Sequence, residues 1–350
     1  MLKDNEISVV VCGAVNPIDT KKCLKSIRKF LPKSEIILST WEGTDVSFLE
    51  GLYDTLVLNK DPLATIFDDY RKKPNNLNRI IVSSQNGINK VARKYILKLR
   101  SDLILQNSNC LKLVDNFENR NMTSLFENRI FSYMLFSKKY DTVKNTKLKL
   151  LFHISDWCYL GLSKDIKELY NIPTVEEPQF SRYFDTNPKP FPDIHEFRKW
   201  EMSPEQYIIS KNAQKVIPQL TFNNYLDLTE NNIKISEDFI INNFRIFTAE
   251  EWGIKILKQE YTNICTQLLN PLDYYSKWIQ IDDYNKYCNG DFPNRGYLIL
   301  KFLYSVKYFE NVQKHIVQIF TIKWNKKLGE IFSAIYYLIK FTPNLIRSLL

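Results

Sequence analysis

The first hundred residues alternate between short apolar runs and longer amphipathic runs, and this alternation is the strongest constraint on the fold. Two segments, residues 18–31 and 76–94, carry apolar side chains at helical spacing. Asp19 or Thr20 is expected to cap the first of these helices. Four runs are typical of buried strands: ISVVVC (7–12), EIILS (35–39), DTLVLN (54–59) and YILKL (95–99). Strands that alternate with helices in this way predict an α/β fold with a mainly parallel sheet flanked by helices.

The pattern loosens after residue 110. Residues 128–136 and 156–162 are typical of further strands, and residues 170–200 form a Pro-rich connection. Residues 203–214 open like a helix, with Ser203 as cap, Pro204 in the first helical position and Gln206 completing a capping box. Helical patterns dominate from Thr248 onward. The sequence therefore predicts one domain in two halves, residues 1–110 and 111–250, followed by a helical C-terminal region, residues 251–350.

Composition and charge exclude several classes of protein. A hydrophobic fraction of 44% and a charged fraction of 25% are those of a folded protein. The net charge of +9 suits an anionic membrane or ligand, but no zinc-finger spacing or aromatic–basic strand supports nucleic-acid binding. The 6 cysteines and 3 histidines are not at metal-ligand spacing, so zinc is not expected and the thiols should be reduced. No signal peptide or membrane-spanning run is recognised, which favours a cytoplasmic location.

Charged residues follow the apolar strand at residues 95–99. Arg100, Ser101 and Asp102 come directly after it, before the apolar run resumes at Leu103. Burying unpaired charges would cost several kcal/mol. We therefore expect these side chains either to pair with each other or to face a charged ligand such as a metal ion or a phosphate. In α/β sheets, ligands collect at the carboxyl ends of strands, where this cluster is predicted to lie.

The stretch NGINKVARKYILKLRSD (86–102) resembles the nucleotide-sugar-binding core of GT-A glycosyltransferases, in which this strand ends in Asp-x-Asp. Here Arg100 stands in place of the first Asp, and Asp102 matches the second. The resemblance implies that Asp102 binds a divalent cation, Mn²⁺ or Mg²⁺, that bridges the donor diphosphate. Arg100 can contact phosphate or hold a neighbouring carboxylate. Whether a metal is required is left open by Arg100, and a purely structural Arg–Asp pair is the alternative.

A wider set of segments is similar to the WavE-type glycosyltransferases of lipopolysaccharide synthesis. The matching segments are VVVCGAV (9–15), IILSTWEGTD (36–45), NRIIVSSQNGINKVARKYILKLRSDL (78–103), FHISDWCYLGLSKD (152–165) and WEMSPEQY (200–207). This resemblance implies a GT-A-like, Rossmann-type fold, with residues 1–110 as the nucleotide-sugar-binding half and 111–250 as the acceptor-binding half. It also implies a glycosyltransferase that moves a sugar from a nucleotide-sugar donor to a glycolipid or oligosaccharide acceptor. The alternative is a non-catalytic subunit that binds a nucleotide sugar or glycan, in which Arg100 marks lost catalysis.

The donor site is expected to be built from three strand ends and one helix. Glu42 follows the second strand, where an acidic residue in this architecture commonly bonds a ribose hydroxyl or base edge, and Trp41 can stack on a ring. The segment containing both also has the shape of an ordinary loop or capping sequence. The predicted donor-binding residues are Gly13, Ala14, Thr40, Trp41, Glu42, Gln85, Asn86, Arg100, Ser101 and Asp102.

Two carboxylates are alternative candidates for the catalytic base that removes the acceptor proton. Asp156 stands just before an aromatic strand, where it can orient or deprotonate a hydroxyl. Glu205 lies in a first helical turn, where the helix dipole favours its charged form. Each also has a structural interpretation, as a turn residue and as a helix-stabilising residue. His153 is interpreted as an ordinary loop histidine, and Asp156 is the preferred base.

The last residues combine basic and apolar side chains. Residues 315–350 hold Lys323, Lys326, Lys327, Lys340 and Arg347 among many Ile, Leu and Phe residues. Their apolar core, residues 331–339, is too short to span a bilayer but suits a helix lying in the membrane interface. We therefore expect a protein peripheral to the inner face of the cytoplasmic membrane. A helix packed on the rest of the chain, or a dimer contact, is the alternative.

Overall fold

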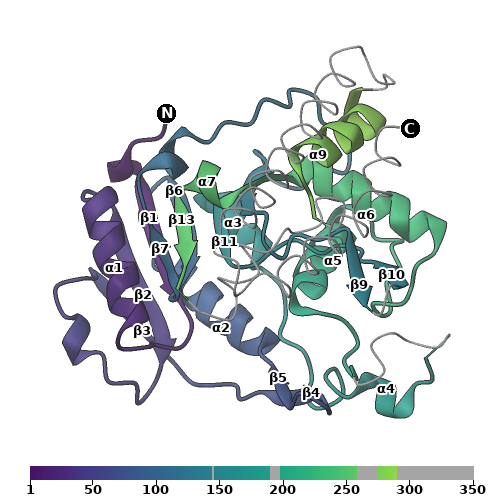
Figure 1. Cartoon of the computed structure of the whole chain (residues 1–350), viewed down its shortest axis with the longest axis horizontal. Helices are drawn as coiled ribbons and strands as arrows, with labels where there is room; N and C mark the ends of the chain where they lie inside the picture. Colours follow the sequence, from purple (N-terminus) through teal and green to yellow (C-terminus); the bar gives the residue numbers. More distant parts are fainter. Residues whose placement is uncertain (144–145, 190–197, 258–273, 290–350) are drawn as a thin grey trace, which may run out of the picture. The chain divides into compact units, whose positions relative to one another are not determined.

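The computed structural model describes residues 1–143, 146–189, 198–257 and 274–289 (Figure 1). Residues Met1–Cys288 form one compact unit. The predicted membrane-surface segment, residues 315–350, lies outside the described residues, as does most of the predicted helical region 251–350. The proposed boundaries at residues 110 and 250 stay predictions.

A seven-stranded sheet forms the centre of this unit. Its strand order is β12 (Phe244–Phe247), β8 (Ile130–Tyr133), β11 (Cys158–Leu162), β6 (Tyr95–Arg100), β1 (Ile7–Cys12), β2 (Glu35–Trp41) and β3 (Thr55–Asn59). Every neighbouring pair is parallel except those made by β11, which runs antiparallel to both β6 and β8. The mainly parallel sheet flanked by helices is therefore confirmed.

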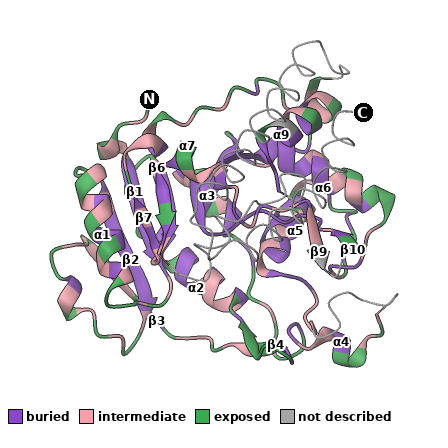
Figure 2. Cartoon of the chain, in the orientation of Figure 1, coloured by how far each residue is buried: buried purple, intermediate pink, exposed green. Residues whose placement is uncertain are grey.

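Successive side chains of the strands pack against helices on opposite faces of this sheet. Val9 and Val11 of β1 share a core with Leu24 of α1 (Asp19–Phe30). Val10, between them, shares the other core with Ile81 of α2 (Leu77–Ile88). Because both faces are covered, the central strands are buried along their length and read as continuous apolar runs (Figure 2).

The helix ends differ in part from their sequence predictions. At α1, neither Asp19 nor Thr20 caps the helix; the Asn16 side chain instead accepts hydrogen bonds from the backbone N–H groups of Ile18 and Asp19, at 2.9 and 3.0 Å. The predicted helix 76–94 ends earlier, at Ile88. By contrast, α5 (Pro204–Val216) begins with the predicted capping box of Ser203 and Gln206.

A glycine brings α2 very close to the sheet. A Cβ atom at Gly87 would lie 2.7 Å from Cγ1 of Val10 and 2.9 Å from Cβ of Ser39. Such distances are shorter than van der Waals contact, so only glycine fits where the last turn of α2 crosses β1 and β2. This contact places the neighbouring Asn86 against the carboxyl edge of the sheet.

Smaller elements complete the compact unit. Within the described residues, the remaining helices are α3 (Ser163–Leu169), α4 (Tyr183–Thr186), α6 (Glu230–Asn243), α7 (Ala249–Trp252) and α9 (Lys277–Tyr284), with a π-helical turn at Asn285–Asn289 and short 3-10 helices at Asp4–Glu6, Ser47–Leu49 and Asn109–Lys112. Three two-stranded sheets pair β4 (Thr65–Asp68) with β5 (Lys73–Asn75), β7 (Leu103–Leu105) with β13 (Ile254–Ile256), and β9 (Tyr140–Val143) with β10 (Thr146–Lys149). Strand β13 corrects the helical prediction for residues 254–256. None of the helices in the described residues is long and apolar enough to cross a membrane.

Candidate functional site

Residues that follow three parallel strands meet at the carboxyl edge of the sheet. After β1, the backbone N–H of Gly13 donates to the carbonyl of Ser39 in β2, at 3.1 Å. The hydroxyl of Ser101, after β6, donates to the carbonyl of Ala14 at 2.8 Å. Gly13 has a φ of +115°, in the region that favours glycine. The predicted residues Gly13, Ala14 and Ser101 therefore do lie together.

Arg100 and Asp102 form a two-pronged ion pair at this edge. Nε of Arg100 lies 3.0 Å from Oδ1 of Asp102, and Nη2 lies 2.6 Å from Oδ2. The guanidinium also stacks on the ring of Trp157, 3.9 Å from its centroid. The two side chains are 28% and 16% exposed, so the pair faces solvent in part. Of the two outcomes expected from the sequence, internal pairing is the one observed.

The donor set offers little to a metal ion. A divalent cation such as Mg²⁺ or Mn²⁺ takes about six ligands, mostly oxygens. At this edge Asp102 supplies one carboxylate, and both of its oxygens already bind Arg100. Within the described ranges, no group of three or more His, Cys, Asp or Glu side chains is placed to hold a metal. The side chains described here do not by themselves make a metal site, and the predicted cation stays a prediction.

Asn59, at the end of β3, joins several predicted residues and was missed by the sequence analysis. Its side-chain nitrogen donates to the carbonyl of Thr40 at 2.7 Å, and its side-chain oxygen accepts from the amide of Asn86 at 2.8 Å. Its carbonyl accepts from the N–H of Glu42 at 2.8 Å. Asn59 thus ties Thr40, Glu42 and Asn86 together. The signal available in the sequence was a polar residue ending an apolar strand.

The other donor-site candidates differ in their surroundings. Trp41 is half-buried and Glu42 is exposed at the rim. The hydroxyl of Thr40 is buried and has no hydrogen-bond partner in the described structure. Gln85 does not join the cluster: its amide donates to the carbonyls of Tyr170 and Ile172, at 2.6 and 2.8 Å. Adjacent helical residues point about 100° apart, which separates Gln85 from Asn86.

The two candidate bases, Asp156 and Glu205, come together in space. Asp156 is buried and stands just before β11, whose antiparallel direction brings its start to the edge where β6 ends. Glu205 lies in the first turn of α5. Burial, followed by the negative charge of Asp156, raises the pKa of Glu205 to about 7. The two alternatives of the sequence analysis therefore lie close enough for the charge of Asp156 to act on Glu205.

Lys98 is the second functional candidate that the sequence analysis missed. It is buried in the middle of β6, where its ammonium group donates to the backbone carbonyl of Asp156. The ammonium also lies 3.9 Å from a carboxylate oxygen of Asp156 and over the rings of Tyr159 and Tyr170. A buried cation at this distance offsets the charge of the carboxylate pair. The signal was a lysine inside an otherwise apolar strand.

His153 stays neutral beside the pair. Burial, and then the charge of Lys138, lowers the pKa of His153 to about 4. Its Nδ1 lies 2.8 Å from the carbonyl of Phe136, which can only accept, so Nδ1 carries the proton. Nε2 is 3.9 Å from Oε2 of Glu205, beyond hydrogen-bond distance. His153 therefore belongs to the wall of the site, as its interpretation as an ordinary histidine predicted.

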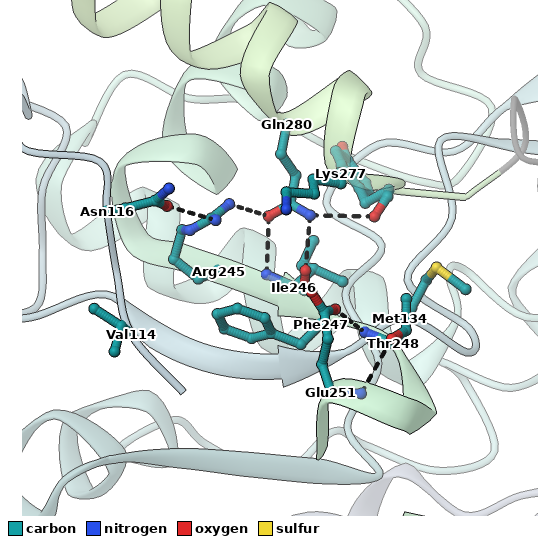
Figure 3. Close-up of a pocket in the computed structure, with 11 residues that line it drawn as sticks. Val114, Asn116, Met134, Arg245, Ile246, Phe247, Thr248, Glu251, Lys277 and Gln280 are labelled. Carbon is teal, nitrogen blue, oxygen red and sulfur yellow. Dashed lines mark hydrogen bonds between the residues drawn. The ribbon is translucent and has the colours of Figure 1, made fainter. Parts of the chain in front are cut away.

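A separate cavity of about 190 Å³ lies where the carboxyl end of β12 meets α7 and α9 (Figure 3). Arg245 lines it, but its two terminal nitrogens donate to Gln280 and Asn116, at 2.8 and 3.0 Å. Gln280 also exchanges hydrogen bonds with the backbone of Ile246 (Figure 3). None of the predicted site residues lines this cavity. Its polar groups join α9 to β12.

The fold and the edge cluster define the class of protein: an α/β protein with a polar site at the carboxyl ends of parallel strands. The sequence model of the family described as WavE lipopolysaccharide synthesis matches residues 7–319. The chain belongs to this family, and the resemblance inferred from its motifs is confirmed.

Comparisons with other proteins add little to this. No curated protein matches the sequence. Among solved structures, the inositol-1-phosphate CTP transferase from T. maritima aligns with a TM-score of 0.27 and 12% identity, over 67% of this chain and 96% of that chain. A cytidylyltransferase from Leptospira borgpetersenii aligns with a TM-score of 0.26 and 12% identity, over 66% of this chain and 96% of that chain. Superpositions this loose carry no functional argument.

Proposed function

We propose that this protein is a glycosyltransferase that moves a sugar from a nucleotide-sugar donor to a lipid-linked surface glycan of the lipopolysaccharide, O-antigen or capsule type. Its membership of a lipopolysaccharide-synthesis family supports the substrate class. The observation that carries the proposal is the buried Asp156, with the partly buried Glu205 nearby, beside the strand end that holds Arg100 and Asp102. Transfer to a hydroxyl needs a base next to a site for an anionic leaving group, and this edge offers both.

The donor is proposed to lie along the ends of β1, β2 and β6. Arg100 is the cation available to the diphosphate, because guanidinium groups bind phosphate oxygens in the same two-pronged way as carboxylates. Binding there would loosen the contact of Arg100 with Asp102 and free the carboxylate. The buried, unpartnered hydroxyl of Thr40 offers a hydrogen bond to the nucleoside part, next to the ring of Trp41. No step is assigned to a divalent cation.

Asp156 is proposed as the base. Lys98 lies beside Asp156, and burial favours the protonated form of Glu205 near neutral pH. Asp156 would take the proton of the acceptor hydroxyl as its oxygen attacks the anomeric carbon. The bond between that carbon and the diphosphate breaks, and the nucleotide leaves with its electron pair beside Arg100.

A second candidate function is a non-catalytic subunit that binds a nucleotide sugar or glycan. The specific observation in its favour is the closed Arg100–Asp102 pair, because it occupies both oxygens of the only carboxylate that matches the Asp-x-Asp motif. A binder would release no nucleotide.

A donor screen separates the two functions. Melting temperature and nucleotide release would be measured with UDP-, GDP-, dTDP- and CMP-sugars, with and without Mn²⁺ or Mg²⁺. We expect at least one donor to raise the melting temperature and to release nucleotide. Asp102→Asn should keep the fold and lose most turnover. Its matched control is Asp54→Asn, which also removes a carboxylate paired with an arginine, Arg28 at 2.6 Å, but just before β3 begins.

Each outcome of the screen has a distinct meaning. Stabilisation by a donor without nucleotide release, even with glycolipid acceptors present, would support the binding subunit. Normal turnover of Asp102→Asn would make Asp102 structural. Absence of stabilisation by every donor would contradict both functions.

A further inference from the structure

The β4–β5 hairpin stands apart from the central sheet and is firmly held on one side (Figure 1). The ring of Phe67 stacks on Trp200, with 3.7 Å between the ring centroids. The side chain of Asn75 donates to the hydroxyl of Ser181 at 3.0 Å. In the turn, the buried carboxylate of Asp68 accepts hydrogen bonds from two successive backbone N–H groups, those of residues 70 and 71. The turn therefore has a defined shape.

The opposite side of the hairpin exposes apolar side chains. Ile66 and Tyr70 are 37% and 74% exposed, and Leu63, just before the hairpin, is 70% exposed. With Leu58 they make up four of the eight large hydrophobic residues that are exposed in the described part of the chain. Half of these residues thus fall within one short stretch of the chain, residues 58–70, and three of the four lie in the hairpin or just before it.

Basic side chains continue this patch. Arg71, Lys72 and Lys73 are all exposed. The nearby acidic groups offset this positive charge only in part: Asp68 is buried and bonded to the backbone, and Asp69, which interacts electrostatically with Lys72, pairs with Arg182 at 2.7 Å. An exposed surface with apolar and aromatic side chains next to lysine and arginine has the chemistry of the interface between lipid headgroups and acyl chains.

We propose that residues 63–73, the β4–β5 hairpin with its preceding Leu63, dock on an anionic lipid membrane. Arg71, Lys72 and Lys73 contact the headgroups, and Leu63, Ile66 and Tyr70 enter the interface. Leu63 and Ile66 favour a membrane over a polyanion such as nucleic acid, because aliphatic side chains neither pair with phosphates nor stack on bases as Tyr70 could. This contact is independent of the C-terminal segment, and it rests on the family's role in lipopolysaccharide synthesis and not on the proposed chemistry.

The test uses the full-length chain and sedimentation with vesicles of phosphatidylglycerol and phosphatidylcholine, or of phosphatidylcholine alone. We expect binding to the anionic vesicles. Replacing Arg71, Lys72 and Lys73 by Gln should weaken partitioning about a hundredfold, since each cation near an anionic surface adds a similar increment. The matched control replaces Lys25, Lys29 and Lys33, which are exposed on α1 and just after it. It removes the same charge at least seven residues beyond Ile18, the exposed hydrophobic residue next to that helix, and should change binding far less.

A second variant separates lipid from other polyanions. Leu63→Asn with Ile66→Thr keeps the charge and should weaken vesicle binding several-fold while leaving retention on heparin unchanged. Melting temperatures and nucleotide release from soluble donor should match those of the unmodified protein, so failure of the docking proposal is distinct from failure of the proposed function. The proposal is overturned if the α1 control behaves like the hairpin variant, if the apolar variant binds vesicles normally, or if the hairpin variants and the unmodified protein bind alike.

Discussion

Asp156 is buried and its negative charge helps to raise the pKa of the nearby, partly buried Glu205. If Asp156 is the base, Asp156→Asn should reduce acceptor-dependent transfer by about 10²-fold or more while donor affinity stays nearly constant. Glu205→Gln should be milder, because glutamine resembles the protonated carboxyl. Steady-state kinetics of both variants decide the assignment. Reversed severity would make Glu205 the base, and full activity in both would exclude each of them.

Lys98 should hold Asp156 in position for proton transfer. Lys98→Met removes the ammonium group that donates to the backbone carbonyl of Asp156 and lies 3.9 Å from its carboxylate. We expect acceptor-dependent transfer to fall, though by less than in Asp156→Asn, while donor affinity stays nearly constant. Steady-state kinetics with donor and acceptor varied in turn measure both quantities. Normal transfer, or an equal loss of donor affinity, would exclude this role.

Contacts between site residues could be predicted from the sequence where the two residues are close together in the chain. Arg100 and Asp102 are two residues apart at the end of one strand, so their pairing follows from local geometry. The meeting of Asp156 with Glu205 does not, because it depends on the antiparallel direction of β11 and on the packing of α5. Lys98 was passed over because its partner, Asp156, lies just before another strand and far away in the sequence.

The stability of the protein should be very sensitive to the size of the side chain at residue 87, where α2 contacts the sheet. Gly87→Ala places a methyl group 2.7 Å from a Val10 methyl carbon, so we expect a loss of about 1–3 kcal/mol in unfolding free energy despite the better helix propensity of alanine. Denaturant unfolding measures it. Gly161→Ala in β11 is the control, since its nearest neighbours are 3.4 Å away in the side chains of Ile130 and Ile166. Equal effects at both positions would show that α2 can move away.

Strands that are covered by helices on both faces of the sheet were the easiest elements to predict. The runs that became β1, β2 and β6 are apolar throughout because helices cover both faces of the sheet. Ends of elements were harder. The cap of α1 comes from Asn16, outside the predicted helix, and β13 is three residues long and gains its pairing from β7, far away in the sequence.

Stability of the whole molecule should fall as pH rises through the titration of Glu205. Its pKa is raised from 4.5 to about 7, so the folded state binds more protons than the unfolded state between these values. Unfolding free energy therefore decreases with pH in this window, by up to about 3 kcal/mol from this group. Glu205→Gln lacks this term and should gain stability relative to the unmodified protein between pH 5 and pH 8.

Chemical denaturation of Glu205→Gln and of the unmodified protein at pH 5 and pH 8 measures how their difference in unfolding free energy changes with pH. His153 contributes with the opposite sign, because its pKa is lowered to about 4, and Asp283 with the same sign, because burial raises its pKa to about 6. Both groups are present in both proteins, so the comparison isolates Glu205. A difference that is independent of pH would contradict the burial described for this carboxyl.

At the scale of the molecule, the sequence predicted the class of fold but not the order of strands. Alternating strand and helix patterns suffice for a parallel sheet. The order β12-β8-β11-β6-β1-β2-β3 depends on which crossovers the chain makes after residue 100, where the pattern loosens. The antiparallel insertion of β11 between β6 and β8 has no local signature, and the carboxylate pair follows from it.

Strand β12 forms one edge of the sheet and covers β8, so β8 can pair with other chains during synthesis until β12 has been made. Strand β8 emerges from the ribosome about residue 130, yet its outer neighbour, β12, begins only at Phe244. Until then β8 offers unpaired backbone groups to any other nascent chain. Fragments chosen for expression should therefore extend past Phe247, and the protein should depend on chaperones late in its translation.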